Sequence, residues 1–168
     1  MQGLHLLEIE DWCSQHGIEH VDDWRVPGNS SLTYSDFLRI SDPLTREVLS
    51  LPASTACLEV LGRWDECLLW IRETGIADNE NWPAFYALRG EDGELNSLDE
   101  RPGHLFSWEE RERLGIYMTG VISNLWDAFI FPVTHGEPET IRMATSHDEF
   151  VDLWSSTPRK FPPLAAPT

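Results

Sequence analysis

The chain has 168 residues, a length that matches one ordinary domain, and 41% of them are hydrophobic, including eight tryptophans and seven phenylalanines. This composition excludes an intrinsically disordered acidic chain, which would lack such aromatic residues. Twenty-nine acidic residues against twelve basic ones give a formal net charge of -17, and a potential of this sign repels DNA, RNA and anionic membrane surfaces.

Targeting signals and membrane spans are not recognisable in the sequence. No N-terminal stretch combines a basic start with an apolar run, and no stretch approaches the roughly 18 apolar residues of a membrane-spanning helix. The chain has an odd number of cysteines, Cys13, Cys57 and Cys67, and they lack CxxC spacing. We therefore expect reduced, buried thiols rather than disulfides or a zinc cluster. We therefore expect a cytoplasmic protein.

The first fifty residues carry the least distinct patterns. Residues 4–16 fit a helix that ends at Gly17, although short strands are an open alternative. The dipeptide Asp42-Pro43 fits a helix cap followed by the first helical position, and Pro52 is expected to end that helix.

The middle of the chain is better patterned. Residues 55–62 are apolar and fit either a strand or a short helix, whereas the five apolar residues 67–71 predict a strand buried on both faces. Asn81 can cap a short helix over residues 82–89. The acidic segment 90–99 that follows is expected to be a loop or an edge hairpin.

The clearest helix begins at Ser107, which forms a capping box with Glu110 and is followed by apolar residues at the 3,4 spacing of one helical face as far as residue 124. Strands over residues 126–133 and 140–145 are predicted next, joined in a hairpin. This half of the chain therefore supplies the most definite elements.

The last elements are a helix and a tail. Ser146 and Glu149 repeat the capping-box spacing and predict a helix over residues 146–155. Residues 158–168 hold four prolines without a core pattern, which predicts a surface arm or a disordered end. We expect a single α/β (α+β) domain over residues 1–157, in which helices pack a small, mainly antiparallel sheet with a C-terminal hairpin.

Acidic residues gather in two fields. Residues 1–24 hold six carboxylates and no Lys or Arg, and the acids between Glu73 and Glu100 are opposed only by Arg89. Such fields attract basic partners, and tryptophans beside them suit the capture of Arg or Lys side chains. A solvated face that keeps the protein soluble is the alternative. The predicted partner-binding residues are Asp22, Asp23, Trp24, Asp78, Glu80, Trp82, Glu91, Asp92 and Glu94.

Several histidines are candidates for catalysis or metal binding. His104 lies in a Gly-containing turn, where it could act as a general base or metal ligand or could anchor the turn. Residues 146–148 have the composition of a Ser-His-Asp triad, but consecutive residues point to different sides. No HxH or HExxH spacing supports a metal set, whose candidates would be His104, His135 and His147 with Asp127 or Asp148. We expect no catalytic residue, metal or cofactor.

Five segments occur in a characteristic order. They are WDECLLWI at 64–71, Glu80-Asn81-Trp82, GHLF at 103–106, WDA at 126–128 and SHDEF at 146–150. Together they resemble an uncharacterised family of small acidic bacterial proteins. The resemblance covers residues 64–154 and brings no activity with it.

At the level of class, the size, acidity, tryptophan content and lack of a catalytic motif are similar to those of bacterial immunity proteins. That similarity implies an acidic surface that covers the basic active site of a toxin. The sequence therefore predicts an immunity-type inhibitor that binds a cognate toxin effector, and neither nucleic acid nor a membrane. The alternatives are an acidic nucleic-acid mimic or adaptor that binds a basic protein, and a small hydrolase-like enzyme that uses His104 and His147.

Overall fold

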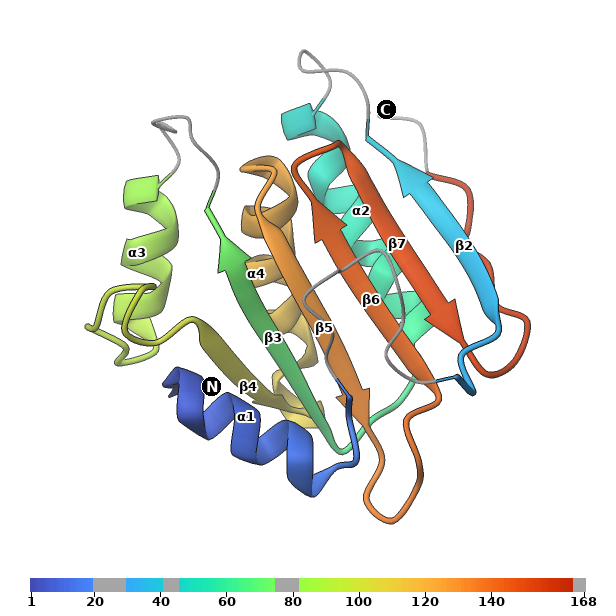
Figure 1. Ribbon diagram of the computed structural model, residues 1–168. Helices are drawn as coiled ribbons and strands as arrows, with labels where there is room; N and C mark the ends of the chain where they lie inside the picture. Colours follow the sequence, from blue (N-terminus) through green and yellow to red (C-terminus); the bar gives the residue numbers. More distant parts are fainter. Residues whose placement is uncertain (20–29, 41–45, 75–81, 165–168) are drawn as a thin grey trace.

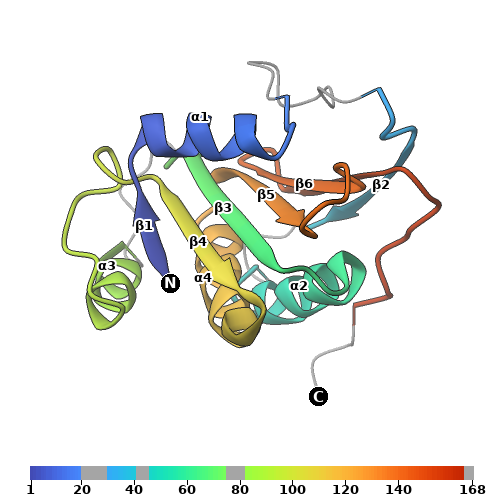
Figure 2. The same cartoon turned by 90° about the horizontal axis from the view of Figure 1, so that it is seen from below.

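The computed structural model describes residues 1–19, 30–40, 46–74 and 82–164. Within them the chain forms one seven-stranded sheet in which every neighbouring pair is antiparallel, and helices cover both faces (Figures 1 and 2). The predicted α+β class is confirmed. The sheet is larger than the small one expected, because the N-terminal fifty residues contribute strands at both of its edges.

The strand order across the sheet is β1-β4-β3-β5-β6-β7-β2. The strands are β1 Gln2–Leu4, β2 Tyr34–Arg39, β3 Glu66–Glu73, β4 Gly103–Ser107, β5 Asp127–Val133, β6 Ile141–Ser146 and β7 Phe150–Ser155. The helices are α1 Leu6–Gln15, α2 Arg46–Leu61, α3 Trp82–Glu91 and α4 Arg111–Ser123, with a 3-10 turn over Trp108–Glu110. Helix α1 lies on one face of the sheet, and α2 and α4 lie on the other (Figure 2).

Two hydrophobic cores lie on the two faces of the sheet. The larger one includes Trp64 and Trp126 and fills the space under α2 and α4. The smaller one forms under α1, whose Ile9 and Cys13 pack on the sheet with Trp70. Helix α1 and β1 therefore belong to the same folded unit as the well-patterned C-terminal half.

Strand β3 lies between β4 and β5 and is buried on both faces. Leu69 and Ile71 belong to the larger core, whereas Leu68 and Trp70 belong to the smaller one. This alternation follows from the period of two in a strand, because successive side chains point to opposite faces. The prediction of a doubly buried strand at residues 67–71 is confirmed.

We expected Pro52 to end a helix, but it lies inside α2. A proline within a helix removes one backbone hydrogen bond at a cost of about 3 kcal/mol. The segment after it, however, carries Ala53, Cys57 and Leu61, all buried against the larger core. The burial of this face offsets the cost, so the helix runs on to Gly62, where the positive φ of 73° ends it.

The predicted helix over residues 146–155 is wrong, because this segment forms a tight turn and strand β7. Strand β7 pairs with β6 on one side and with β2 on the other, so its backbone hydrogen bonds are made within the sheet. The Ser146 Oγ atom accepts from the amide of Asp148 at 3.1 Å, and Glu149 has a φ of 70°. Residues that cap helices also stabilise turns, which is why the sequence pattern pointed to the wrong element.

Other predictions stand closer to the structure. The capping box at Ser107 is present, since the Ser107 amide donates to Glu110 at 2.9 Å. The hairpin formed by β5 and β6 is confirmed. Residues 158–164 do form a surface arm, but one with core contacts: Phe161 packs against the larger core and its amide donates to Asp36 at 2.9 Å. Residues 165–168 lie outside the described part of the chain.

Candidate functional site

Five of the nine predicted partner-binding residues lie outside the residues that the structure describes. These are Asp22, Asp23, Trp24, Asp78 and Glu80. Their part in binding stays a prediction, and the structure places the other four.

Two of these four are carboxylates engaged within the protein. Asp92 accepts from the Arg113 guanidinium at 2.8 Å and from the Tyr117 hydroxyl at 2.8 Å, which ties the end of α3 to α4. Glu94 is buried and accepts two hydrogen bonds of 2.8 Å from Asn96. Burial opposes its ionisation, but these hydrogen bonds hold the pKa of Glu94 below its ordinary value. Both side chains therefore have structural partners.

The remaining two behave differently from each other. Glu91 projects into solvent with 69% of its side chain exposed and pairs with Arg113 at 3.1 Å. Trp82 packs edge-to-face on Trp126 with ring centroids 5.7 Å apart, so its ring is partly buried against the larger core. A surface that binds a partner has to use acids other than Asp92 and Glu94.

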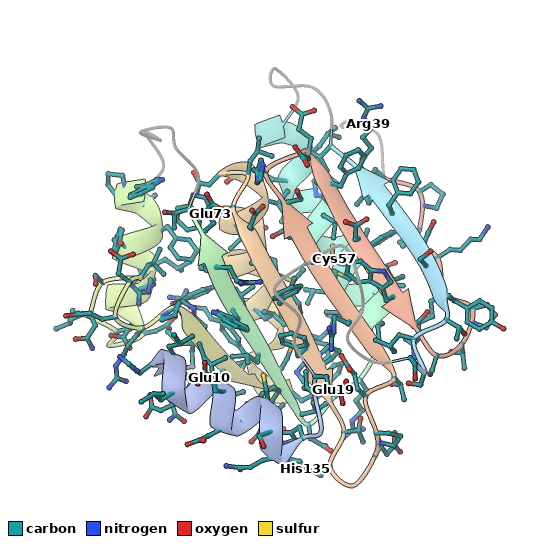
Figure 3. The ribbon with its side chains drawn as sticks, viewed as in Figure 1. Glu10, Glu19, Arg39, Cys57, Glu73 and His135 are labelled. Atoms are coloured by element: carbon teal, nitrogen blue, oxygen red, sulfur yellow. The ribbon has the colours of Figure 1, made fainter. Side chains whose placement is uncertain are left out.

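A groove of about 490 Å³ lies between the start of α1 and the second acidic field. Leu6 lines it at the start of α1, and Glu73 and Asp99 are acids of the second field; no carboxylate of the first field is among the described lining residues. Figure 3 shows Glu73 at the end of β3. The described lining residues are Leu6, Trp70, Ile71, Arg72, Glu73, Thr74, Leu98, Asp99 and Pro102.

The groove combines an apolar floor with carboxylates at its edge. Trp70 and Leu98 are buried beneath it, whereas Glu73 and Asp99 are exposed. The one basic lining residue described there, Arg72, has its guanidinium over the Trp70 ring at 5.3 Å. The groove can therefore receive a chain segment that has both apolar and cationic parts.

A smaller cavity of about 210 Å³ shares Arg72 and Glu73 with the groove and contains His147. The Asp127 carboxylate accepts from the His147 amide at 2.7 Å and from its Nδ1 atom at 2.8 Å. This hydrogen bond to Asp127 raises the pKa of His147, with a smaller contribution from Asp148. His147 is thereby favoured as a cation, and it fastens the β6–β7 turn to the start of β5.

This cavity lacks the other parts of a nucleophilic site. Thr145 is the one hydroxyl residue among its described lining residues, and its Oγ1 atom donates to the Trp126 carbonyl at 2.7 Å. A base whose pKa is raised is also a poorer proton acceptor at neutral pH. The arrangement of His147 and Asp127 fits a structural contact better than a catalytic pair.

His104 lies in the interior of β4 and has no exposed surface. Its Nε2 atom accepts from Arg89 Nε at 3.0 Å. Burial, followed by the positive charge of Arg89, lowers the pKa of His104 to about 3. His104 is therefore a neutral core residue rather than the turn residue we expected, and it cannot reach a substrate or a metal from solvent.

The three histidines of the predicted metal set do not come together. His104 is in the interior, and the turns that carry His147 and His135 lie at opposite ends of the sheet (Figure 1). His135 instead meets His16 and Glu66, whose ligand atoms all lie within 4.8 Å of one another. Sequence reasoning missed this group, because no local spacing connects residues 16, 66 and 135.

The three cysteines are free and buried, as expected from their number and spacing. Burial raises the pKa of Cys13 to about 11 and raises the pKa values of Cys57 and Cys67 as well. These thiols are therefore poor nucleophiles. Among the described residues, no helix is both long enough and apolar enough to cross a membrane.

Comparison with known proteins finds no match. No family model, no curated protein and no solved structure matches the chain. The resemblance to small acidic bacterial proteins and the class-level similarity to immunity proteins stay predictions.

Proposed function

We propose that this protein is an immunity-type inhibitor that captures a basic segment of a cognate toxin effector in the groove between α1 and the end of β3. The observation that carries the proposal is an apolar groove with two carboxylates of the second acidic field, Glu73 and Asp99, exposed at its edge. The formal net charge of -17 provides the long-range attraction for such a partner. In this proposal the protein acts in the cytosol.

The chemistry of the groove suits Arg or Lys side chains. Their aliphatic stems can pack on the exposed Leu6 while their charged ends reach Glu73 and Asp99. A volume of about 490 Å³ lies in the range of protein sites that enclose ligand groups. The apolar floor contributes contact area, and the carboxylates contribute specificity and association rate.

A solvated acidic face would serve solubility alone and needs no groove. The two explanations differ in what a change of charge does. If only the total charge matters, reversal of any two exposed acids has the same effect. If the groove binds, position matters.

The first experiment compares two double charge reversals. Glu73→Arg with Asp99→Arg alters the groove, whereas Glu59→Arg with Glu112→Arg alters exposed acids of α2 and α4 on the other face of the sheet. Each reversal adds two charges, so both variants have a net charge of -13 in place of -17. The two proteins are therefore matched in total charge.

The probe is a fluorescent peptide of alternating arginine and leucine residues, and its Kd is measured by anisotropy. The groove variant is expected to bind at least about tenfold more weakly than the unaltered protein, a change of about 1.4 kcal/mol. The control variant should stay within about twofold, because screening limits the effect of distant charges. Equal weakening in both variants would contradict a groove site.

The second experiment identifies the partner. The unaltered protein and both variants are used as affinity baits in an extract of the source organism, and the captured proteins are identified by mass spectrometry. We expect a basic protein that the groove variant fails to retain, and whose expression is toxic unless this protein is co-expressed. A captured DNA- or RNA-binding factor without toxicity would favour the adaptor alternative instead.

A further inference from the structure

Three side chains able to bind a metal meet at the end of α1, each from a different element. His16 is the C-cap residue of α1, Glu66 begins β3, and His135 lies between β5 and β6. The His16 Nε2 atom lies 3.9 Å from Glu66 Oε2, and the His135 Nε2 atom lies 4.0 Å from Glu66 Oε1. Figure 3 shows His135 at the end of the sheet beside α1.

Both imidazole rings present the same atom to the Glu66 carboxylate. The His16 Nδ1 atom lies 2.8 Å from the Trp12 carbonyl oxygen. A carbonyl can only accept, so Nδ1 carries a proton, and in the neutral ring the lone pair lies on Nε2, the atom that faces Glu66. The His135 Nδ1 atom faces the Asp65 carboxylate at 3.9 Å, which leaves its Nε2 atom on the Glu66 side as well.

The carboxylate is oriented too. The Trp12 indole N–H donates to Glu66 Oε2 at 2.9 Å, so the direction of this carboxylate is fixed from α1. In metal sites, the second ring nitrogen of a histidine ligand bonds to a carbonyl or a carboxylate, and the carboxylate ligands are themselves hydrogen-bonded. The Trp12 carbonyl and the Trp12 indole occupy these outer positions, and the Asp65 carboxylate lies 3.9 Å from His135 Nδ1.

We propose that His16, Glu66 and His135 form a binding site for a divalent transition-metal ion, with Zn²⁺ as the ion that the ligand set fits best. Two imidazoles and one carboxylate are donors that Zn²⁺ prefers, and three protein ligands leave a fourth position for water. The His135 side chain is 63% exposed, so this fourth position faces solvent.

The distances and charges are compatible with the ion. Bonds of about 2.0–2.1 Å in a tetrahedral site put donor atoms about 3.3 Å apart, so the observed 3.9 and 4.0 Å, in a group whose atoms lie within 4.8 Å of one another, require an inward movement. His135 is on an exposed turn and can make it. The carbonyl end of α1 and the nearby Asp65 add negative potential, which favours a cation.

Binding also explains why His135 faces this cluster. The hydrogen bond from the Trp12 indole to Glu66 holds α1 against β3 without any ion, and the bond of His16 to the Trp12 carbonyl fixes the end of α1. They do not require a second imidazole, yet the His135 ring stacks on the His16 ring with an interplanar angle of 21° and centroids 6.4 Å apart. A metal ion would join α1, β3 and the β5–β6 turn.

The test uses the full chain, freed of metal with a chelator that is then removed, and titrates it with ZnCl₂ in a calorimeter. His135→Ala removes a ligand from an exposed turn, where loss of folding is not expected. Glu66→Gln keeps an oxygen acceptor for Trp12 but is a poorer metal ligand. His147→Ala is the matched control, because it removes another exposed imidazole at the opposite end of the sheet.

The expected result is one Zn²⁺ per chain and a rise in Tm of about 5–10 °C at a hundredfold excess of Zn²⁺ over its Kd. Both ligand variants should bind at least about tenfold more weakly, and His147→Ala should bind as the unaltered protein does. The absence of saturable binding below about 1 mM Zn²⁺ would overturn the proposal. So would an unchanged Kd in His135→Ala, or an equal loss in His147→Ala.

Discussion

The substitution Glu139→Gln should destabilise the protein by about 3–5 kcal/mol, because it leaves a buried guanidinium without its counter-ion. The Arg142 Nε and Nη2 atoms donate to the two Glu139 oxygens at 2.8 and 3.0 Å, and both side chains are only 1% exposed. Arg142 is held further by the Glu19 carbonyl at 2.7 Å and lies over the Phe131 ring at 5.0 Å. It therefore cannot turn to solvent without a rearrangement of the sheet face.

The assay is urea denaturation followed by tryptophan fluorescence. In a thermal melt, 1 kcal/mol corresponds to about 2–4 °C in Tm for a chain of this size, so Tm should fall by about 6–20 °C. The m-value should not change, since the surface exposed on unfolding is the same. A paired replacement, Glu139→Leu with Arg142→Met, removes both charges and should lie within about 2 kcal/mol of the unaltered protein.

The two results together test the physical reasoning. A buried ion pair adds little net stability, whereas one buried charge without its partner costs several kcal/mol. A loss below about 1 kcal/mol in Glu139→Gln would show that water reaches Arg142 in solution. A paired replacement as unstable as the sum of the two single ones would show that the charges do not interact.

Three further predictions concern single residues. Gly103→Ala would place a Cβ atom 2.7 Å from two Ile9 side-chain atoms, so the free energy of unfolding measured in urea should fall by about 1–3 kcal/mol. Adding Ile9→Ala to the same chain should restore part of this loss. An equal loss with and without Ile9 would contradict this contact. His104 has a pKa of about 3 in the folded state against an ordinary 6.5, so its contribution is complete above pH 6.5 and is lost as pH falls. This histidine should therefore lower the stability of the folded protein by about 2 kcal/mol between pH 7 and pH 5, measured as the difference between the unaltered protein and His104→Gln at the two pH values. NMR should show no titration of this ring between pH 5 and 8. His147 has a raised pKa, so its contribution to folding stability is complete below the ordinary pKa of 6.5 and is lost as pH rises through the raised pKa. Asp127→Asn should lower the pKa of His147 in an NMR titration. An unchanged pKa would show that the hydrogen bond to Asp127 does not cause the shift.

The helices and strands that are specified by neighbouring residues in the sequence were predictable. The strand at 67–71 was recognisable because five consecutive apolar residues leave no polar face, and the helix after Ser107 because its capping box and its apolar spacing agree. The helix that continues past Pro52 and the strand within residues 146–155 were not predictable, because packing against distant segments determines both. Strand β7 has hydrogen-bonding partners 100 residues or more away in β2, which no local pattern records.

The sequence by itself determined the α+β class, the buried thiols and an acidity divided between two fields. These follow from composition and short-range spacing. Only the tertiary structure decided that Leu6, Glu73 and Asp99 line one groove, and that His16 and His135 meet. Such groupings depend on the strand order and on where α1 crosses the sheet, and contacts between residues far apart in the chain fix both.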